Sequence, residues 1–164
     1  PNFALKDTEG DVIDINQLDG PVLMIFMCNH CPYVQSKFET LDSLYEEFGD
    51  DIQFIGINSN AQAHPEDSYE KMKDYVSDGR INFTYLEDGS QEVAKKFGAT
   101  CTPDPFLFDS DKKLVYHGRI DDAHGPGKKA TTHELKDAME GLLKEGSISI
   151  EERPSMGCNI KWKD

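Results

Sequence analysis

Apolar residues along this chain fall into short continuous runs separated by segments with a helical repeat. Residues 22–27 and 52–58 are apolar runs of strand length, as expected for strands that are covered on both faces. Shorter apolar segments bounded by turn residues predict further strands. These are residues 3–5, 12–15, 83–86, 105–108 and 114–117, of which the last two flank a turn and predict a hairpin.

Helical periodicity is clearest after the first long run. Val34, Phe38, Leu41, Leu44 and Phe48 recur at three- and four-residue intervals, which predicts one helix of about four turns from Pro32 to the glycine at position 49. Similar spacing predicts helices over residues 68–76, 91–97 and 133–144. Strands and helices therefore alternate.

This alternation predicts an α/β fold, with a mixed central sheet covered by helices on both faces and an N-terminal β-hairpin. No linker or repeat divides residues 1–164, so we expect a single domain. Residues 153–164 have no periodicity but contain Cys158 and the only tryptophan, Trp162. We expect this C-terminal tail to pack back onto the domain.

Charge and cysteine content narrow the function. Lys and Arg total 17 against 31 Asp and Glu, so the net charge is −14, and nucleic acid and anionic membrane surfaces are disfavoured as partners. No apolar run approaches the ~20 residues of a spanning helix, which predicts a soluble protein without a membrane partner, and the cytoplasm is the expected location. Four cysteines are too few for a disulfide-stapled scaffold.

Cys28 and Cys31 form a C-x-x-C pair where a predicted buried strand ends and a helix begins. The unpaired backbone N–H groups of a helix start stabilise a thiolate, so we expect a lowered pKa at Cys28. Cys31 then lies close enough to resolve a mixed disulfide. Between them, a protonated His30 would stabilise the thiolate further; a solvent-facing histidine without a role is the other interpretation.

Metal chemistry is the main alternative for this pair. A structural zinc site needs four ligands, and the sequence offers no second C-x-x-C and no H-x(3–5)-H. Haem attachment needs histidine after the second cysteine, where the chain has Pro32. A copper site that uses both thiolates with His117 or His124 remains open on ligand softness.

Several motifs, in order along the chain, resemble one family. CNHCPYV (28–34), INSN (57–60), CTPDPFLFD (101–109) and the closing GCNIKWK (157–163) are similar to a thioredoxin-like subgroup of the alkyl hydroperoxide reductase/thiol-specific antioxidant (redoxin) family. The resemblance implies a thioredoxin-like fold in which a cis Thr102–Pro103 bond faces the dithiol. Cys101 would then be a third thiol of the site or a small buried residue, and Cys158 a resolving or a packing residue.

The sequence also departs from the two best-known patterns of this fold. A peroxiredoxin resembles P-x-x-x-T-x-x-C, and here Cys31 fits the final cysteine, but Cys28 stands at the threonine and Met24 at the proline. A thioredoxin has a buried acid in the strand before the cysteines, and residues 22–27 contain none. Arg119, Asp121 and Asp122 are expected to be solvated surface charges.

These observations predict a thiol–disulfide oxidoreductase that needs no prosthetic cofactor. Cys28 would attack, Cys31 would resolve, His30 would tune the thiolate, and Pro103 would shape the substrate groove because it lacks a backbone donor. Its partners would be protein or small-molecule thiols and disulfides. The alternatives are a thiol-dependent peroxidase with an antioxidant role, for which peroxide is the substrate, and a copper-delivery module.

Overall fold

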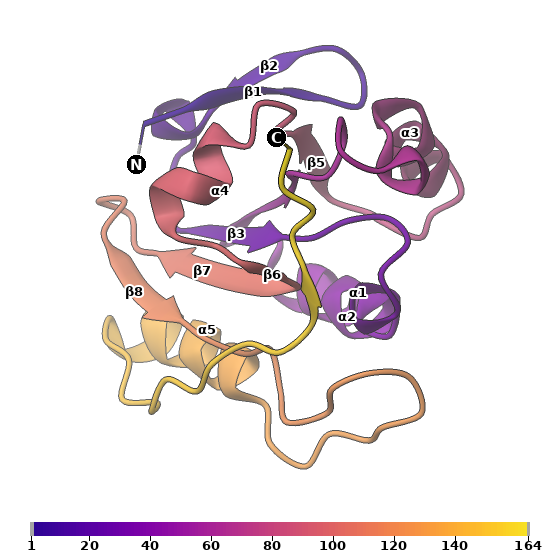
Figure 1. Cartoon of the computed structure of the whole chain (residues 1–164). Helices are drawn as coiled ribbons and strands as arrows, with labels where there is room; N and C mark the ends of the chain where they lie inside the picture. Colours follow the sequence, from indigo (N-terminus) through magenta and orange to yellow (C-terminus); the bar gives the residue numbers. More distant parts are fainter. Residues whose placement is uncertain (1, 164) are drawn as a thin grey trace.

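A seven-stranded mixed sheet forms the centre of the molecule in the computed structural model, which describes residues 2–163 (Figure 1). The strand order is β2-β1-β5-β4-β3-β7-β8, in which β3, β4 and β5 are parallel and the other pairings are antiparallel. The strands are β1 (Ala4–Asp7), β2 (Val12–Asp14), β3 (Val22–Phe26), β4 (Gln53–Asn58), β5 (Thr84–Glu87), β7 (Asp104–Phe108) and β8 (Leu114–His117).

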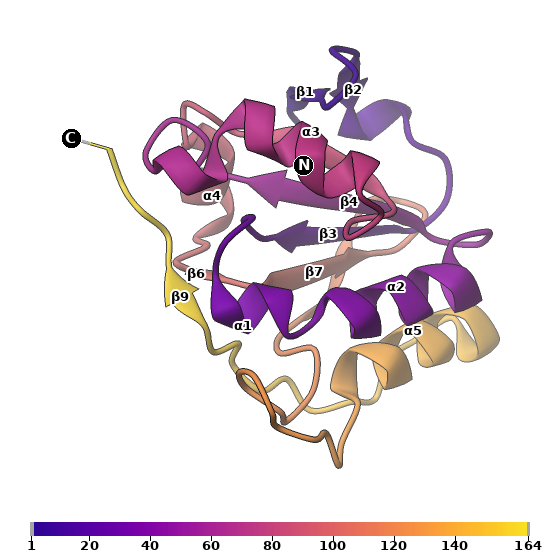
Figure 2. The same ribbon diagram turned by 90° about the vertical axis from the view of Figure 1, so that its right-hand side faces the viewer.

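Helices cover both faces of this sheet, which confirms the expected fold class. They are α1 (Pro32–Gln35), α2 (Phe38–Phe48), α3 (Tyr69–Ser77), α4 (Glu92–Phe97) and α5 (Glu134–Glu145), with two 3-10 turns, η1 (Ile15–Gln17) and η2 (Pro65–Asp67). In Figure 2, α1, α2 and α5 lie together along one side of β3 and β7. Helix α3 contributes to the same apolar cluster, whereas α4 packs on the opposite face.

The fully buried strand β3 shows how the sequence builds these two layers. Leu23, Ile25 and Met27 belong to the cluster under α2, α3 and α5, whereas Val22, Met24 and Phe26 belong to the cluster under α4. Successive side chains of a strand point to opposite faces, so a strand covered twice must be apolar throughout. The site lies at the carboxyl end of this strand.

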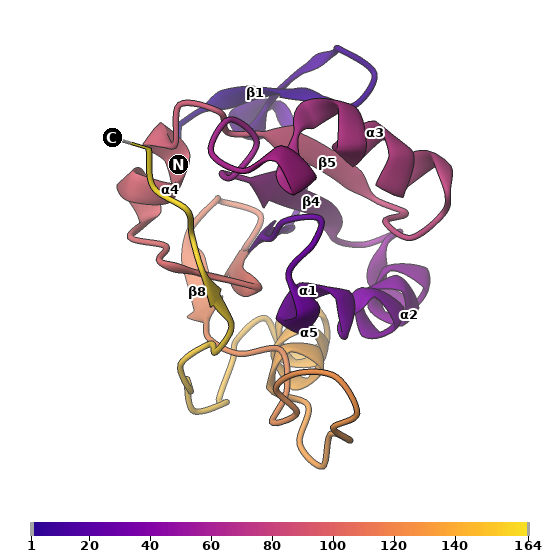
Figure 3. The same ribbon diagram turned by 45° about the vertical axis from the view of Figure 1, so that its right-hand side comes forward.

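The C-terminal tail crosses the molecule as an extended segment. In Figure 3 it runs in yellow past β8 toward α4. Its strand β9 (Cys158–Asn159) pairs antiparallel with β6 (Cys101–Thr102) to form a second, two-stranded sheet. Among residues 2–163, no helix combines the length and apolar character that crossing a membrane requires.

The expected four-turn helix from residue 32 onward is wrong in one respect, because it is broken into α1 and α2 at Ser36 and Lys37. The apolar repeat continues across the break, so periodicity does not reveal it. The Lys37 side chain is only 8% exposed, and its Nζ lies 2.5 Å from Asp121 Oδ1. A buried lysine needs a partner, and the chain bends where this ion pair forms.

The expectation that Asp121 is a solvated surface charge is therefore also wrong. Its side chain is 3% exposed and also accepts a hydrogen bond from the backbone N–H of Ala123. Arg119 binds Glu134 Oε2 at 2.6 Å, both side chains being mostly covered. Asp122 is half-buried, and its carboxylate accepts hydrogen bonds from the backbone of Thr131 and Thr132.

Removal of one partner of the buried pair should destabilise the fold strongly. Lys37→Met leaves the Asp121 carboxylate buried without a counter-charge, so we expect the free energy of unfolding to fall by about 3 kcal/mol in denaturant titration. Asp121→Asn in the same chain should recover part of this loss. As a control, Lys136→Met removes an exposed contact with Glu47 at 3.7 Å and should cost less than about 1 kcal/mol. Equal effects of the two lysine substitutions would contradict a buried ion pair.

Candidate redox site

The C-x-x-C pair lies between the end of β3 and the start of α1. The backbone N–H of Met27 donates to the carbonyl of Ile57 at 2.9 Å, which continues the β3–β4 pairing up to the motif. Cys31 is the residue that caps α1, and Pro32 occupies its first turn, where the missing N–H has no helical partner to lose. The strand-to-helix junction expected from the sequence is confirmed.

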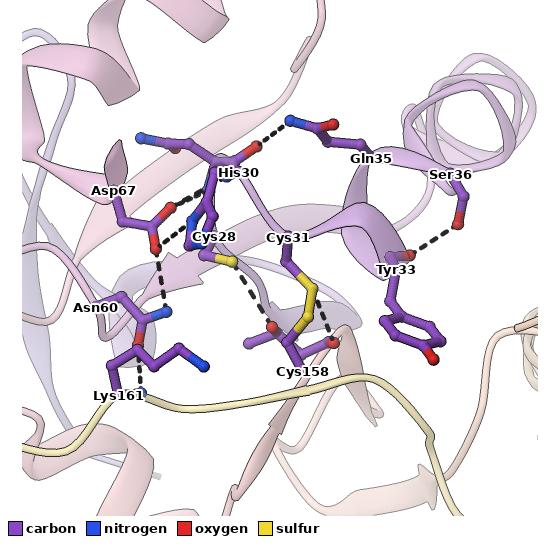
Figure 4. The surroundings of a disulfide bond; sticks show 12 residues. Cys28, His30, Cys31, Tyr33, Gln35, Ser36, Asn60, Asp67, Cys158 and Lys161 are labelled. Carbon is purple, nitrogen blue, oxygen red and sulfur yellow. Dashed lines mark hydrogen bonds and ion pairs between the residues drawn. A yellow bond between two sulfur atoms is a disulfide. The ribbon is translucent and has the colours of Figure 1, made fainter. Parts of the chain in front are cut away.

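Cys31 forms a disulfide with Cys158 of the tail (Figure 4). The two residues are 127 positions apart in the sequence, and their Cα atoms are 6.4 Å apart, within the usual range for a disulfide. The β6–β9 pairing brings them together, because Thr102 and Cys158 are directly opposite in its register. The sequence left the role of Cys158 open between a resolving and a packing residue, and the structure places it in a sulfur–sulfur bond.

Thr102 is the common neighbour of both sulfurs of the motif. Its Oγ1 is 3.7 Å from Cys28 Sγ, and its carbonyl oxygen is 4.0 Å from Cys31 Sγ. The Thr102–Pro103 peptide bond is cis, as the family resemblance implied. Pro103 lines a pocket with Tyr33, Lys37 and residues 119–121, 123–125, 155 and 156. The structure therefore gathers Thr102, Cys28, Cys31 and Cys158 into one site.

Cys28 differs from expectation, because it is a free, buried thiol and not an ionised helix-start cysteine. It is 1% exposed, and burial raises its pKa to about 11, with a further increase from the negative charge of Asp67. Hydrogen bonds from Thr102 and from the backbone of Cys31 and His30 lower the pKa, but desolvation of the charged form outweighs them. The expected lowering of the Cys28 pKa is therefore wrong in this disulfide-bonded state.

A buried carboxylate, Asp67, lies beside the motif and was missed in the sequence. It comes from η2 and is fully covered. Its oxygens accept hydrogen bonds from the backbone N–H groups of Asn29 (2.8 Å) and His30 (3.1 Å) and from Asn60 Nδ2 (3.2 Å). The acid that thioredoxins carry in the preceding strand is thus supplied here by a loop that follows β4. The sequence signals were the INSN motif, which leads into this loop, and the PEDSYEKM segment (65–72) that follows it and contains Asp67; both carry the family resemblance.

His30 lies beside the same carboxylate. Its Nδ1 is 2.8 Å from Asp67 Oδ2, its side chain is 32% exposed, and its ring stacks on His64 with centroids 4.2 Å apart. The Cys28 sulfur, a ring nitrogen of His30 and an oxygen of Asp67 all lie within 4.8 Å of one another. These three groups offer the sulfur, nitrogen and oxygen donors that a zinc ion accepts. They also place a proton acceptor next to the buried thiol.

Cys101 and His117 lie elsewhere. Successive residues of a strand face opposite ways, so Cys101 points away from the side of Thr102; its sulfur contacts the carbonyl of Ser155 at 3.9 Å. Burial, followed by the charge of Asp104, raises its pKa to about 11. The same Asp104 carboxylate bonds His117 Nε2 at 3.0 Å, so this candidate ligand of the alternative copper site contacts an acid and not the dithiol.

Comparison with known proteins shows that the chain is similar to redoxins. The family model described as the AhpC/TSA family matches residues 1–117. The thiol-disulfide oxidoreductase ResA of Halalkalibacterium halodurans is 26% identical over 145 residues, which cover 87% of this chain and 74% of ResA. A crystal structure of an uncharacterized conserved protein from Geobacillus kaustophilus has a TM-score of 0.92 and 39% identity, and the match covers 99% of this chain and 89% of that one.

A second solved structure gives the same picture. A hypothetical protein from Sinorhizobium meliloti 1021 has a TM-score of 0.91 and 39% identity, with 99% of this chain and 92% of that chain covered. Two structures therefore match nearly the whole chain, including the tail that carries Cys158, whereas the family model ends at residue 117. The expected family and fold are confirmed, and this chain belongs to the AhpC/TSA family.

Proposed function

We propose that this protein is a thiol–disulfide oxidoreductase in which Cys31 carries the exchanging sulfur. One observation supports it above all: Cys31 is bonded to a sulfur from outside the motif while Cys28 lies beside it as a thiol. That arrangement resembles the intermediate of thiol–disulfide exchange, in which the enzyme and its substrate share a mixed disulfide and a second thiol lies nearby. The thiol–disulfide oxidoreductase activity for which the ResA relatives are named supports the same reaction.

We assign the two cysteines roles that are the reverse of those expected from the sequence. Cys31, at the start of α1, is bonded to the sulfur of Cys158, which lies outside the motif. Cys28 lies between Thr102 and the Asp67–His30 pair. We therefore assign the mixed disulfide to Cys31 and the resolving step to Cys28. Cys28 thiolate attacks Cys31 Sγ, the Cys28–Cys31 bond forms, and the substrate leaves as a thiolate.

Proton transfer explains the need for the buried carboxylate. A thiol with a pKa of about 11 contributes few thiolates near neutral pH, so a nearby base must take its proton as the sulfur attacks. Asp67 and His30 lie within reach of the Cys28 sulfur. His30 therefore acts as part of a proton relay, and no prosthetic cofactor enters the reaction.

The second candidate function is that of a thiol-dependent peroxidase, whose substrate would be peroxide. A peroxidatic cysteine depends on nearby cations or donors to stabilise its thiolate. Arg119 lies beyond the β7–β8 hairpin, and its guanidinium is bound by Glu134 Oε2 at 2.6 Å and lies 3.4 Å from Thr132 Oγ1. We therefore favour disulfides over peroxide as the substrate.

Cysteine variants should separate the two roles in an insulin-disulfide reduction assay with dithiothreitol as electron donor. Cys31→Ser removes the exchanging sulfur and should lower the rate to that of the uncatalysed control. Cys28→Ser should trap a mixed disulfide on Cys31 that mass spectrometry detects. Cys101→Ser is the matched control and should retain the wild-type rate. The proposal is wrong if Cys31→Ser remains active, or if the wild-type protein consumes peroxide but leaves insulin intact.

The pH dependence of Cys28 alkylation tests the electrostatic environment. In the oxidised protein, the alkylation rate of Cys28 should increase with pH, with a midpoint near pH 11. Burial and the negative charge of Asp67 both favour the thiol form, which reacts slowly. Asp67→Asn removes the negative charge, so the midpoint should move to lower pH.

Asp104→Asn is the matched control for that measurement. Its charge raises the pKa of Cys101, so it should shift the alkylation midpoint of Cys101 and leave that of Cys28 in place. Peptide mass analysis distinguishes the two cysteines. A Cys28 midpoint near the ordinary value of a free cysteine would contradict the buried environment described above.

A further inference from the structure

We propose that Cys158 is a third redox-active cysteine and that its strand, β9, acts as an internal substrate. Strand β9 occupies the position on β6 where an extended polypeptide substrate that carries a cysteine would bind. The inference rests on the proposed exchange function and names its substrate class. It also gives the C-terminal tail a chemical role, because the tail presents one sulfur to Cys31 in the manner of a bound protein thiol.

Backbone pairing positions the tail. Strand β9 lies antiparallel to β6, with Cys158 opposite Thr102 and Asn159 opposite Cys101. One residue further, the N–H of Ile160 donates to the carbonyl of Thr100 at 2.9 Å. Main-chain pairing of this kind recognises an extended segment through its backbone and leaves the side chains to set specificity. The register then determines which side chain meets Cys31, and here it is a cysteine.

Gly157 permits this close approach. A Cβ atom at this position would collide with the backbone of Thr102, at its carbonyl carbon and oxygen. Because that obstacle is backbone, it cannot move aside as a flexible side chain does. Gly157 therefore allows strands β6 and β9 to approach each other closely. A substitution at Gly157 should weaken the binding of the tail to β6 without removing a sulfur.

The tail is held mainly by polar contacts, as an exchangeable segment requires. Beyond the cysteine, the N–H of Lys161 donates to Asn60 Oδ1 and that of Lys163 to Gln91 Oε1. Among residues 153–163, Ile160 alone is buried, whereas Met156 and Trp162 are 57% and 43% exposed. Few apolar contacts must be lost when the segment leaves.

The chemistry is an internal exchange that consumes no external oxidant. Cys28 loses its proton to the Asp67–His30 pair and attacks Cys31 Sγ. The Cys28–Cys31 bond forms as the Cys31–Cys158 bond breaks, and Cys158 leaves as a thiolate that takes up a proton. One disulfide is present before and after, so the oxidation state of the chain is unchanged. The released tail leaves β6 open to a polypeptide substrate.

Disulfide mapping tests the role of Cys158. The full chain is oxidised in a glutathione buffer, its free thiols are alkylated, and its digest is analysed without reduction. We expect two isomers in the wild-type protein, Cys31–Cys158 and Cys28–Cys31. Cys28→Ser should give the first alone and Cys158→Ser the second alone. Gly157→Ala should shift the ratio roughly tenfold toward Cys28–Cys31, since overpacking against a backbone is costly.

Met156→Ala is the matched control for Gly157→Ala, because it changes an exposed neighbour on the same tail and should leave the ratio unchanged. Alkylation of Cys158 in every oxidised species would overturn the proposal, as would a bond from Cys158 to Cys101. The oxidation is repeated over a range of pH. If the wild-type protein contains the Cys31–Cys158 bond alone at every pH, the exchange step is wrong.

A peptide tests the substrate class. Residues 154–164 are synthesised with thionitrobenzoate on the cysteine, and release of the coloured thiol reports attack by Cys31 in the Cys28→Ser/Cys158→Ser protein. We expect this peptide to react about two- to tenfold faster than one with N-methylisoleucine at position 160, which cannot donate to Thr100. Equal rates for both peptides and for glutathione thionitrobenzoate would overturn recognition through β6.

The exchange activity and the role of Cys158 are tested by different measurements. If wild-type protein does not reduce insulin disulfides, the proposed function is wrong whatever the disulfide map shows. If insulin is reduced at the same rate by wild type and Cys158→Ser, and Cys158 is never bonded, the function stands and the role of Cys158 is wrong.

Discussion

The covalent link between Cys31 and Cys158 is the constraint on which the chemistry of this site depends. It ties the start of α1 to a tail 127 residues away and holds β9 against β6. With the tail in place, Cys28 is buried and its pKa rises instead of falling. Cys28, which the sequence predicts as an ionised thiolate, is therefore a neutral, buried thiol while the link is intact, and the proposed exchanging sulfur is that of Cys31, which carries the tail.

A second constraint is electrostatic. Asp67 is fully buried, and it is stabilised by two backbone N–H groups, by Asn60 and by contact with His30. Its charge opposes ionisation of Cys28, yet one of its oxygens and a ring nitrogen of His30 lie within 4.8 Å of the Cys28 sulfur. In the proposed reaction, the Asp67 charge adds to the burial that keeps the thiol neutral at rest, and the Asp67–His30 pair receives its proton when it attacks. The acid comes from a loop after β4, which frees β3 to be apolar along its whole length.

Much of the fold follows from local patterns, because periodicity records which residues are buried. The hairpin strand Leu114–His117 and the buried runs β3 and β4 lie within a residue or two of their predicted bounds. The break at Lys37, the position of Asp67 and the partner of Cys31 were not predictable in this way. Each depends on contacts between residues 37 to 127 positions apart, which leave no trace in local spacing. The family resemblance supplied the cis bond at Pro103 but no partner for Cys158.

The central claim is that Cys31 belongs to every one-disulfide form of the chain and changes partners between Cys28 and Cys158. Carbon-13 NMR of protein labelled at its cysteine Cβ atoms measures this directly, because these signals differ between thiol and disulfide. On titration with oxidised glutathione, the Cys31 signal should move fully into the disulfide range, while Cys28 and Cys158 share the remaining disulfide population between them. A Cys158 signal that stays in the thiol range throughout, with Cys28 fully oxidised, would contradict the claim.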